Sequence, residues 1–171
     1  YENLAPAFAD IHINGGQRLH FTQSTSVESV LDIAEASHQT GCFYTLPTLI
    51  TSSTENIYRG IDAVREFQQK YPDKGVLGMH LEGPFISTQK RGAHLAKYIR
   101  RPSIPELQSL IDYGKDVLKM ITIAPEQLEE DALQLLLDSG IRVSAGHSNA
   151  TYAQTMDFFA KGGDLITHFY N

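Results

Sequence analysis

Apolar positions along the chain follow two alternating periods. Short runs that are mostly apolar, or apolar at every second residue, predict strands at 7–13, 42–50, 76–82, 117–123, 141–146 and 164–168. Between these runs, apolar residues recur at three- and four-residue spacing, which predicts helices at about 26–39, 55–71, 103–113, 125–139 and 150–161. A longer loop is expected at 83–102, and no internal repeat or interdomain linker is visible.

Residues at the expected helix ends support these limits. Thr25 and Glu28 have the spacing of a capping box at the start of the first helix, and Pro72 stops the second. Pro125 suits the first turn of the fourth helix, and Gly140 suits the position just after its end.

The alternation of strands and helices predicts an α/β fold with a parallel sheet and helical crossovers. Two architectures compete, an open doubly wound sheet and part of a (β/α)8 barrel. A doubly wound nucleotide-binding sheet usually carries a Gly-rich phosphate turn after its first strand, but Gly15-Gly16 is followed by Gln-Arg-Leu-His. A barrel instead collects its chemistry at the C-terminal ends of its strands. We therefore expect a partial TIM-type barrel with about six of the eight strands.

Polar side chains that can bind ligands close most of the predicted strands: His12, Asn14, His80, Glu82, His147 and His168. In a barrel these strand ends converge, and two imidazoles with one carboxylate could bind a divalent ion while leaving positions open for water and substrate. A single His on a strand is more often a satisfied core residue. Glu82 is the stronger indication, because a buried carboxylate is costly unless it is paired or ligating.

Composition narrows the class of protein. Fourteen Lys and Arg against twenty Asp and Glu give a net charge of −6, so nucleic acid is not an expected partner. No apolar run approaches the ~20 residues of a membrane helix, and no secretory signal is visible, so we expect a cytoplasmic protein without a membrane partner. Since Cys42 is the single cysteine, His and carboxylates must hold any metal.

Four motifs come in a characteristic order: HLEGPF at 80–85, KRGAH at 90–94, AGHSNAT at 145–151 and THFYN at 167–171. Together with DIHINGG at 10–16, they closely resemble the N-acetylglucosamine-6-phosphate deacetylases of the amidohydrolase superfamily. The resemblance covers essentially the whole chain. It implies a metal-dependent hydrolase that removes the acetyl group from N-acetylglucosamine-6-phosphate, giving acetate and glucosamine-6-phosphate.

The resemblance also implies roles for particular residues. It places the metal on Glu82, His147 and His168, the same residues that the strand ends suggest. It places the sugar substrate on His94 and the backbone amide of Ala93, whereas without the resemblance His94 would be interpreted as an exposed loop residue. In this family the Asn of the last motif helps to bind the phosphate end of the substrate. That position is Asn171.

The first predicted strand leaves the number of metal ions open. Two-metal amidohydrolases present His-x-His there, whereas single-metal members of this family often have Gln-x-Asn. This chain has His12-x-Asn14, so we expect one divalent ion, with His12 as a possible additional contact or a hydrogen-bonding residue of the barrel mouth. Zn²⁺ fits nitrogen and oxygen ligands best, and Fe²⁺, Mn²⁺ or Co²⁺ are alternatives.

Parts of the family pattern are not found in residues 1–171. The resemblance leads us to expect an incomplete catalytic barrel domain without the small β-sandwich of the family, and a general acid–base Asp beyond Asn171. By this reasoning no residue of the chain is the proton carrier, and the chain alone would be poorly active. Its open sheet edges and apolar lumen should favour association. The full-length protein is expected to be a homodimer or larger.

Two other readings remain. One is another amidohydrolase, such as a cyclic amidase or a deacetylase for a different amino sugar, and the other is a non-catalytic half-barrel scaffold. The basic residues around the 83–102 loop are interpreted mainly as a solvated face, with attraction of a phosphorylated sugar as the minority reading: Lys90, Arg91, Lys97, Arg100 and Arg101.

Overall fold

Six parallel strands form one curled sheet in the computed structural model, which describes residues 5–170. The strands lie in sequence order, and helices alternate with them along the chain. The strands are β1 (Phe8–Ile13), β2 (Cys42–Ile50), β3 (Met79–Glu82), β4 (Leu118–Ile123), β5 (Arg142–Ala145) and β6 (Leu165–Ile166). The helices are α1 (Val27–Gln39), α2 (Thr54–Lys70), α3 (Ile104–Gly114), α4 (Glu130–Asp138) and α5 (Tyr152–Ala160). The expected partial (β/α) barrel is confirmed.

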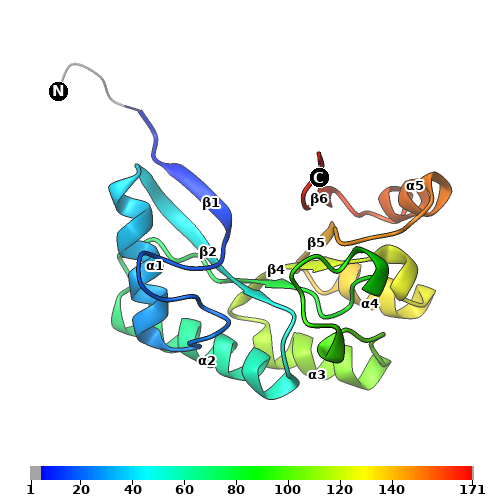
Figure 1. The fold of residues 1–171 in the computed structure, drawn as a ribbon, viewed down its shortest axis with the longest axis horizontal. Helices are drawn as coiled ribbons and strands as arrows, with labels where there is room; N and C mark the ends of the chain where they lie inside the picture. Colours follow the sequence, from blue (N-terminus) through cyan, green and yellow to red (C-terminus); the bar gives the residue numbers. More distant parts are fainter. Residues whose placement is uncertain (1–4, 171) are drawn as a thin grey trace.

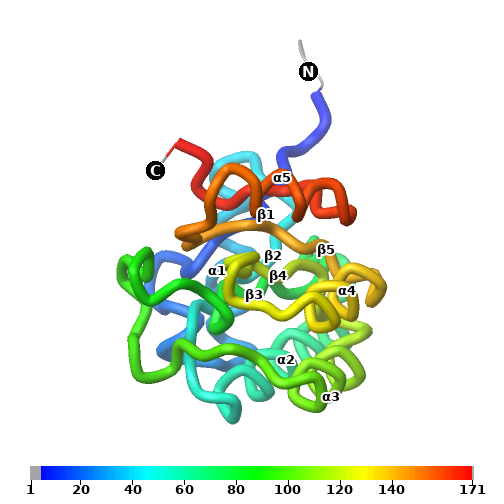
Figure 2. Tube along the Cα trace, turned by 90° about the vertical axis from the view of Figure 1, so that its right-hand side faces the viewer, coloured from blue at the N-terminus to red at the C-terminus, as the bar shows by residue number. Residues whose placement is uncertain are grey.

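The sheet curves like the wall of a barrel that is open on one side. In Figure 1, β1 and β2 lie on one side, β4 lies in the middle above α2 and α3, and β5 and β6 lie on the other side. The helices α1 to α4 cover the outer, convex face, and Figure 2 shows α2 and α3 lying beneath the sheet. Because all strands are parallel, their C-terminal ends meet at one rim of the curl.

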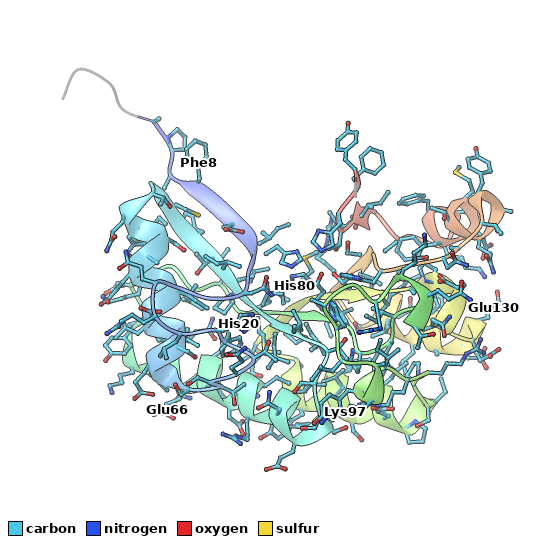
Figure 3. The ribbon with its side chains drawn as sticks, viewed as in Figure 1. Phe8, His20, Glu66, His80, Lys97 and Glu130 are labelled. Carbon is cyan, nitrogen blue, oxygen red and sulfur yellow. The ribbon has the colours of Figure 1, made fainter. Side chains whose placement is uncertain are left out.

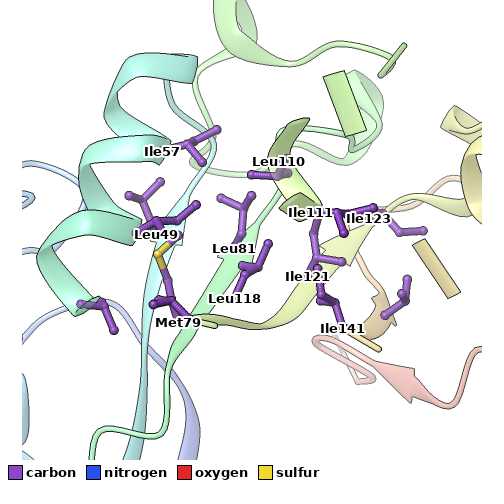
Figure 4. Close-up of a cluster of buried hydrophobic side chains, with 14 of the residues drawn as sticks. Leu49, Ile57, Met79, Leu81, Leu110, Ile111, Leu118, Ile121, Ile123 and Ile141 are labelled. Atoms are coloured by element: carbon purple, nitrogen blue, oxygen red, sulfur yellow. The ribbon is translucent and has the colours of Figure 1, made fainter. Parts of the chain in front are cut away.

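The core lies between the sheet and the outer helices. Leu49, Met79, Leu81 and Ile121 point from the strands toward helix residues such as Ile57, and all five are nearly or completely buried (Figure 4). The side chains between them along each strand point to the concave face. The inner face is apolar at the end of the sheet where the strands begin, where a cavity of about 500 Å³ is lined by Ile11, Leu46, Leu77, Lys119, Met120, Arg142 and Leu165.

Several element limits differ from those that the sequence predicts. The first helix is capped by Ser26 with Ser29, because Thr25 instead hydrogen-bonds Asn56. Pro125 opens a separate 3₁₀ turn, and α4 begins only at Glu130. The last strand, predicted at 164–168, ends at Ile166.

β1 and β6 each pair with a single strand within the described part of the chain. The two halves of β2 pair with different strands: Cys42–Pro47 pair with β1, and Thr48–Ile50 pair with β3. This stagger tilts the strands and produces the curvature of a barrel wall. Among the described helices, none combines the length and apolar character needed to cross a lipid bilayer.

Candidate metal and substrate site

The concave face changes from apolar to polar toward the C-terminal ends of the strands. Along β3, Met79 and Leu81 face the helices, so His80 and Glu82 face the inside of the curl. Figure 3 shows His80 inside the curl, whereas the labelled Glu66, Lys97 and Glu130 lie on the outer surface. His80 is fully buried and Glu82 is 2% exposed. These two residues place a charged carboxylate above a buried imidazole.

Glu82 is the centre of the site. Its Oε1 lies 3.0 Å from Nε2 of His147 and 3.0 Å from Nε2 of His168. Its Oε2 lies 3.1 Å from Nε2 of His12 and 3.8 Å from Nε2 of His94. One carboxylate therefore has four imidazoles around it, contributed by β1, by the 83–102 loop and by the segments after β5 and β6.

These residues form two overlapping groups with the geometry of metal ligands. Within each group the ligand atoms lie within 4.8 Å of one another, one group being Glu82 with His12 and His168, the other Glu82 with His94 and His147. The structure thus brings Glu82, His147 and His168 together as expected, and it adds His12 and His94 to the same cluster. One carboxylate with imidazole nitrogens suits Zn²⁺ or another borderline divalent ion. That these residues ligate a metal remains a prediction.

The hydrogen bonds of Nδ1 distinguish His147 from His94. Nδ1 of His147 lies 2.9 Å from the carbonyl oxygen of Lys90 and must donate to it. The protonated ring therefore donates to Glu82 through Nε2, and the neutral ring offers the lone pair of Nε2 to the site. Nδ1 of His94 accepts from the backbone N–H of Thr51 at 3.3 Å, so its proton lies on Nε2. His147 is therefore prepared to bind a cation, and His94 is prepared to donate a hydrogen bond to an oxygen.

Electrostatics keep the carboxylate charged. Burial would raise the pKa of Glu82, but hydrogen bonds from His12 and His147 outweigh it and hold the pKa below its usual range. Contact with Glu82 raises the pKa of His147 against the opposing effect of burial. Burial lowers the pKa of His94 to about 4 and that of His80 to about 3, so both are neutral at pH 7. The site thus concentrates negative charge on Glu82 and surrounds it with imidazoles.

Two residues of the cluster have backbone conformations that are unfavourable for their type. His147 has φ 49° and His168 has φ 59°, and no other non-glycine residue of the described chain has a positive φ. Such conformations cost on the order of 1–3 kcal/mol and persist where the surroundings enforce them, often at functional sites. Each lies two residues beyond the end of its strand, β5 or β6, and both are metal ligands that the sequence predicts.

Gly83 explains why the chain can turn sharply just after Glu82. Its φ is +83°, and a Cβ at this position would lie 2.1 Å from Oγ1 of Thr51. Both the positive φ and the clash with Thr51 exclude a side chain at this position. Glycine here lets the 83–102 loop leave β3 and fold back over the rim, where the backbone N–H of Ser87 donates to the carbonyl of His147.

The 83–102 loop contains both the predicted substrate residues and the basic residues. His94 is 3% exposed, so the reading of it as an exposed loop residue is wrong, because its ring turns inward to Thr51 and Glu82. Ala93 is exposed beside it, and its role in binding substrate remains a prediction. Most of the basic residues are exposed as expected, but Arg100 is half-buried and bound to Glu106. Asn171 lies outside the described residues.

Open space adjoins the cluster on the side of β5 and β6. A cavity of about 480 Å³ is lined by His147, His168, Lys90, Ser148 and Thr155, among others. This volume is within the range of small-molecule sites. Asn14, which the sequence pairs with His12, is not part of the cluster, since its side chain donates to the carbonyl of Thr48.

Comparison with known proteins gives consistent results. No family model matches the chain. It is 37% identical to the N-acetylglucosamine-6-phosphate deacetylase of Haemophilus influenzae, over 99% of this chain and 44% of that protein. It is 35% identical to the N-acetylgalactosamine-6-phosphate deacetylase of Escherichia coli O157:H7, over 99% of this chain and 45% of that protein. The chain therefore spans less than half the length of these relatives.

Solved structures show the same relationship. The crystal structure of N-acetylglucosamine-6-phosphate deacetylase from Pasteurella multocida matches with a TM-score of 0.90 and 33% identity, covering 96% of this chain and 43% of that chain. A mutant of the Mycobacterium smegmatis enzyme, in complex with N-acetyl-D-glucosamine-6-phosphate, matches with a TM-score of 0.86 and 29% identity, over 97% of this chain and 43% of that chain. In sequence and in fold, nearly all of this chain is homologous to one barrel segment of the N-acetylglucosamine-6-phosphate deacetylases, which identifies it as a relative of that family.

Proposed function

We propose that this chain provides the metal-binding rim of an enzyme that hydrolyses the acetamide group of an N-acetylated amino-sugar 6-phosphate. Glu82 carries the proposal, because its Oε1 lies 3.0 Å from the Nε2 atoms of both His147 and His168 at the strand ends. The relatives described above share this segment and are named for this reaction. The mutant complex described above holds N-acetyl-D-glucosamine-6-phosphate.

Different residues of the site would bind the metal and the substrate. Glu82, His147 and His168 would hold one divalent ion, Zn²⁺ in the first instance. Bound there, the ion would polarise the amide carbonyl and acidify a water molecule. The carbonyl of Lys90 keeps the lone pair of His147 Nε2 directed inward. The Nε2–H of His94 would donate to an oxygen of the sugar and orient it. His12 would either stabilise the Glu82 carboxylate or contact the ion from the opposite side.

The proton that moves from water to the leaving amine requires a base near the cluster. We propose that this group is an Asp outside residues 1–171, since Glu82 already interacts with imidazoles through both oxygens. General acid–base catalysis typically contributes on the order of 10²–10⁴ in rate. The chain by itself should therefore release acetate slowly or not at all. We further propose a cytoplasmic protein that is dimeric or larger.

The test of this function is acetate release by the longest polypeptide that the source gene encodes, loaded with Zn²⁺. The substrates are N-acetylglucosamine-6-phosphate, its C4 epimer N-acetylgalactosamine-6-phosphate, and unphosphorylated N-acetylglucosamine. We expect acetate release from a 6-phosphate and a much lower kcat/KM without the phosphate. Equal rates with and without phosphate would contradict the substrate class.

The galactosamine derivative is the second candidate substrate. Relatives named for it are 34–35% identical to this chain, and those named for the glucosamine derivative are 34–37% identical. Since the two ranges overlap, the comparison of kcat/KM between the two epimers decides. A protein that binds no stoichiometric divalent ion and releases no acetate from either would instead be a non-catalytic scaffold.

His94→Ala separates substrate binding from metal binding. Removing one hydrogen-bond donor to the sugar should raise KM about tenfold. The Zn²⁺ content should stay at that of the unchanged protein, because the ring presents an N–H to the site rather than a lone pair. His147→Ala is the matched control and should lose the metal. Loss of zinc from His94→Ala would show that His94 is a ligand.

A further inference from the structure

A line of buried side chains connects the strands directly below the site. The ring of His80 lies between two hydroxyl groups, with Nδ1 3.2 Å from Oγ1 of Thr48 and Nε2 2.8 Å from Oγ1 of Thr122. Oγ1 of Thr122 lies 2.9 Å from Oγ1 of Thr167, which lies 2.7 Å from Oγ of Ser144. We call these five residues the hydroxyl belt. It joins β2, β3, β4 and β5 to the residue that follows β6, and every member is at most 7% exposed.

One assignment of protons satisfies every member of the belt. Ser144 donates to Thr167, Thr167 donates to Thr122, and Thr122 donates to Nε2 of His80. Nδ1–H of His80 donates to Thr48, whose hydroxyl donates to the carbonyl of Leu46 at 3.1 Å. A fully satisfied buried network of this kind gives a rigid and unique arrangement. The belt therefore fixes the spacing of the strands that carry Glu82 and His168.

Thr167 is the link on which His168 depends. β6 has two residues, and it makes two register pairs with β5, Ser144 with Leu165 and Ala145 with Ile166. After that the side chain of Thr167 binds both β4 and β5, and its backbone N–H donates to Ala145. The next residue, His168, is 41% exposed at its side chain and has a positive φ. Its ring contacts the rings of His12 and His147 at the open side of the site, and Thr167 provides the adjoining backbone anchor.

We infer that Thr167, through its hydrogen bonds to Thr122 and Ser144, is a positioning residue that holds the imidazole of His168 against Glu82. The consequence for metal affinity rests on the proposed function. The consequence for the position of the ring does not, because the 3.0 Å contact between His168 Nε2 and Glu82 Oε1 exists in the protein alone.

The test is Thr167→Val, which removes the hydroxyl and nearly preserves the shape of the side chain. Loss of a partner that orients a ligand typically weakens metal binding 10–100-fold, so we expect the Kd for Zn²⁺, measured by chelator competition, to rise by about that factor. In the metal-free protein, the ¹⁵N NMR signals of the His168 ring should shift and broaden. Thr167→Ser, which restores the hydroxyl, should return both measurements toward the unchanged protein.

Thr45→Val is the matched control. Thr45 is 1% exposed on β2, and its hydroxyl has no hydrogen-bond partner among residues 5–170. This variant should leave the Kd and the His168 signals unchanged. Both variants are made in the longest polypeptide that the gene encodes, and thermal unfolding confirms that each is folded.

Each outcome decides between the two claims. Unchanged His168 signals and Zn²⁺ affinity in Thr167→Val would overturn the inference while leaving the metal site intact. Absence of Zn²⁺ binding by the protein without substitutions would contradict the proposed function. The ¹⁵N NMR signals of His168 in the metal-free protein would still test the positioning role of Thr167. Equal effects of Thr45→Val and Thr167→Val would show a general packing effect and would also overturn it.

Discussion

Glu82→Gln is expected to abolish stoichiometric binding of a divalent ion. The carboxylate is the single anionic group among the clustered ligands, and its two oxygens contact His12, His147 and His168. An amide removes the negative charge and replaces one oxygen with an N–H₂ donor that would face an imidazole. Because loss of an outer partner alone costs 10–100-fold, loss of this central ligand should weaken the affinity for Zn²⁺ by more than about 100-fold.

The measurement is metal content after dialysis, together with Kd by chelator competition. Glu106→Gln is the matched control, since Glu106 is a half-buried carboxylate that pairs with Arg100 and belongs to neither group of clustered ligands. It should retain one ion per chain. If Glu82→Gln still holds one ion per chain, the ion must bind elsewhere and the proposed site would be wrong.

Asp32→Ala is expected to lower the free energy of unfolding by about 3 kcal/mol. Oδ2 of Asp32 accepts the backbone N–H groups of Arg18 at 2.8 Å and Leu19 at 2.9 Å. The Asp32 side chain is 5% exposed, and the alanine variant leaves two partly buried backbone donors without this acceptor. The loop that connects β1 to α1 would lose the contact that fixes it, which can be measured by urea denaturation.

Arg18→Ala separates the two kinds of contact to Asp32. The Arg18 side chain is 70% exposed, and its ion pair with Asp32 is screened by water. Because this variant keeps both backbone hydrogen bonds, it should cost well under half as much as Asp32→Ala. An equal loss of stability in the two variants would contradict the view that the backbone donors carry most of the effect.

The stability difference between Asp32→Ala and the unchanged protein should also depend on pH. Burial raises the pKa of Asp32, but hydrogen bonds from the Arg18 and Leu19 backbone outweigh it, so the pKa in the folded state is lowered. A carboxyl whose pKa is depressed on folding stabilises the protein above its unfolded pKa of about 3.9, and this contribution is lost as pH falls through the folded value. The difference should therefore be constant near pH 7 and shrink below about pH 4.

Local sequence signals were sufficient for the order and type of the elements. Ile57, Ile61, Val64 and Phe67 recur at helical spacing and are all buried on α2, because a helix must bury its apolar face. Limits were less certain where two neighbouring residues could serve as caps. Ser26 rather than Thr25 caps α1, since the choice depends on Asn56, which lies far along the chain.

The candidate site was predictable in part for a similar reason. Glu82, His147 and His168 each follow or end a strand, and parallel strands bring such positions to one rim. The orientation of a ring, however, depends on contacts between distant segments. His94 turns inward because Thr51 binds its Nδ1, and the reading of it as an exposed loop residue did not include that contact.

Neither the hydrogen bonds of the hydroxyl belt nor the role of Asp32 was predicted from the sequence. Thr48, Thr122 and Ser144 are ordinary residues of β-strands and Thr167 follows one, and nothing in their local sequence marks them as members of a network with His80. Their hydrogen bonds join β2, β3, β4 and β5 to the residue after β6, so only the register of the whole sheet shows them.

The sequence by itself determined the strand and helix alternation, the parallel sheet and the ligand-capable residues at strand ends. These follow from the periodicity of burial and from the alternation of side chains along a strand, which are properties of short segments. Tertiary structure alone decided that four imidazoles surround Glu82, which ring nitrogens face it and which hydroxyls lie beneath it. Those features depend on how the strands are staggered around the curl, and that stagger is set by packing between segments as far apart along the chain as those of His12 and His168.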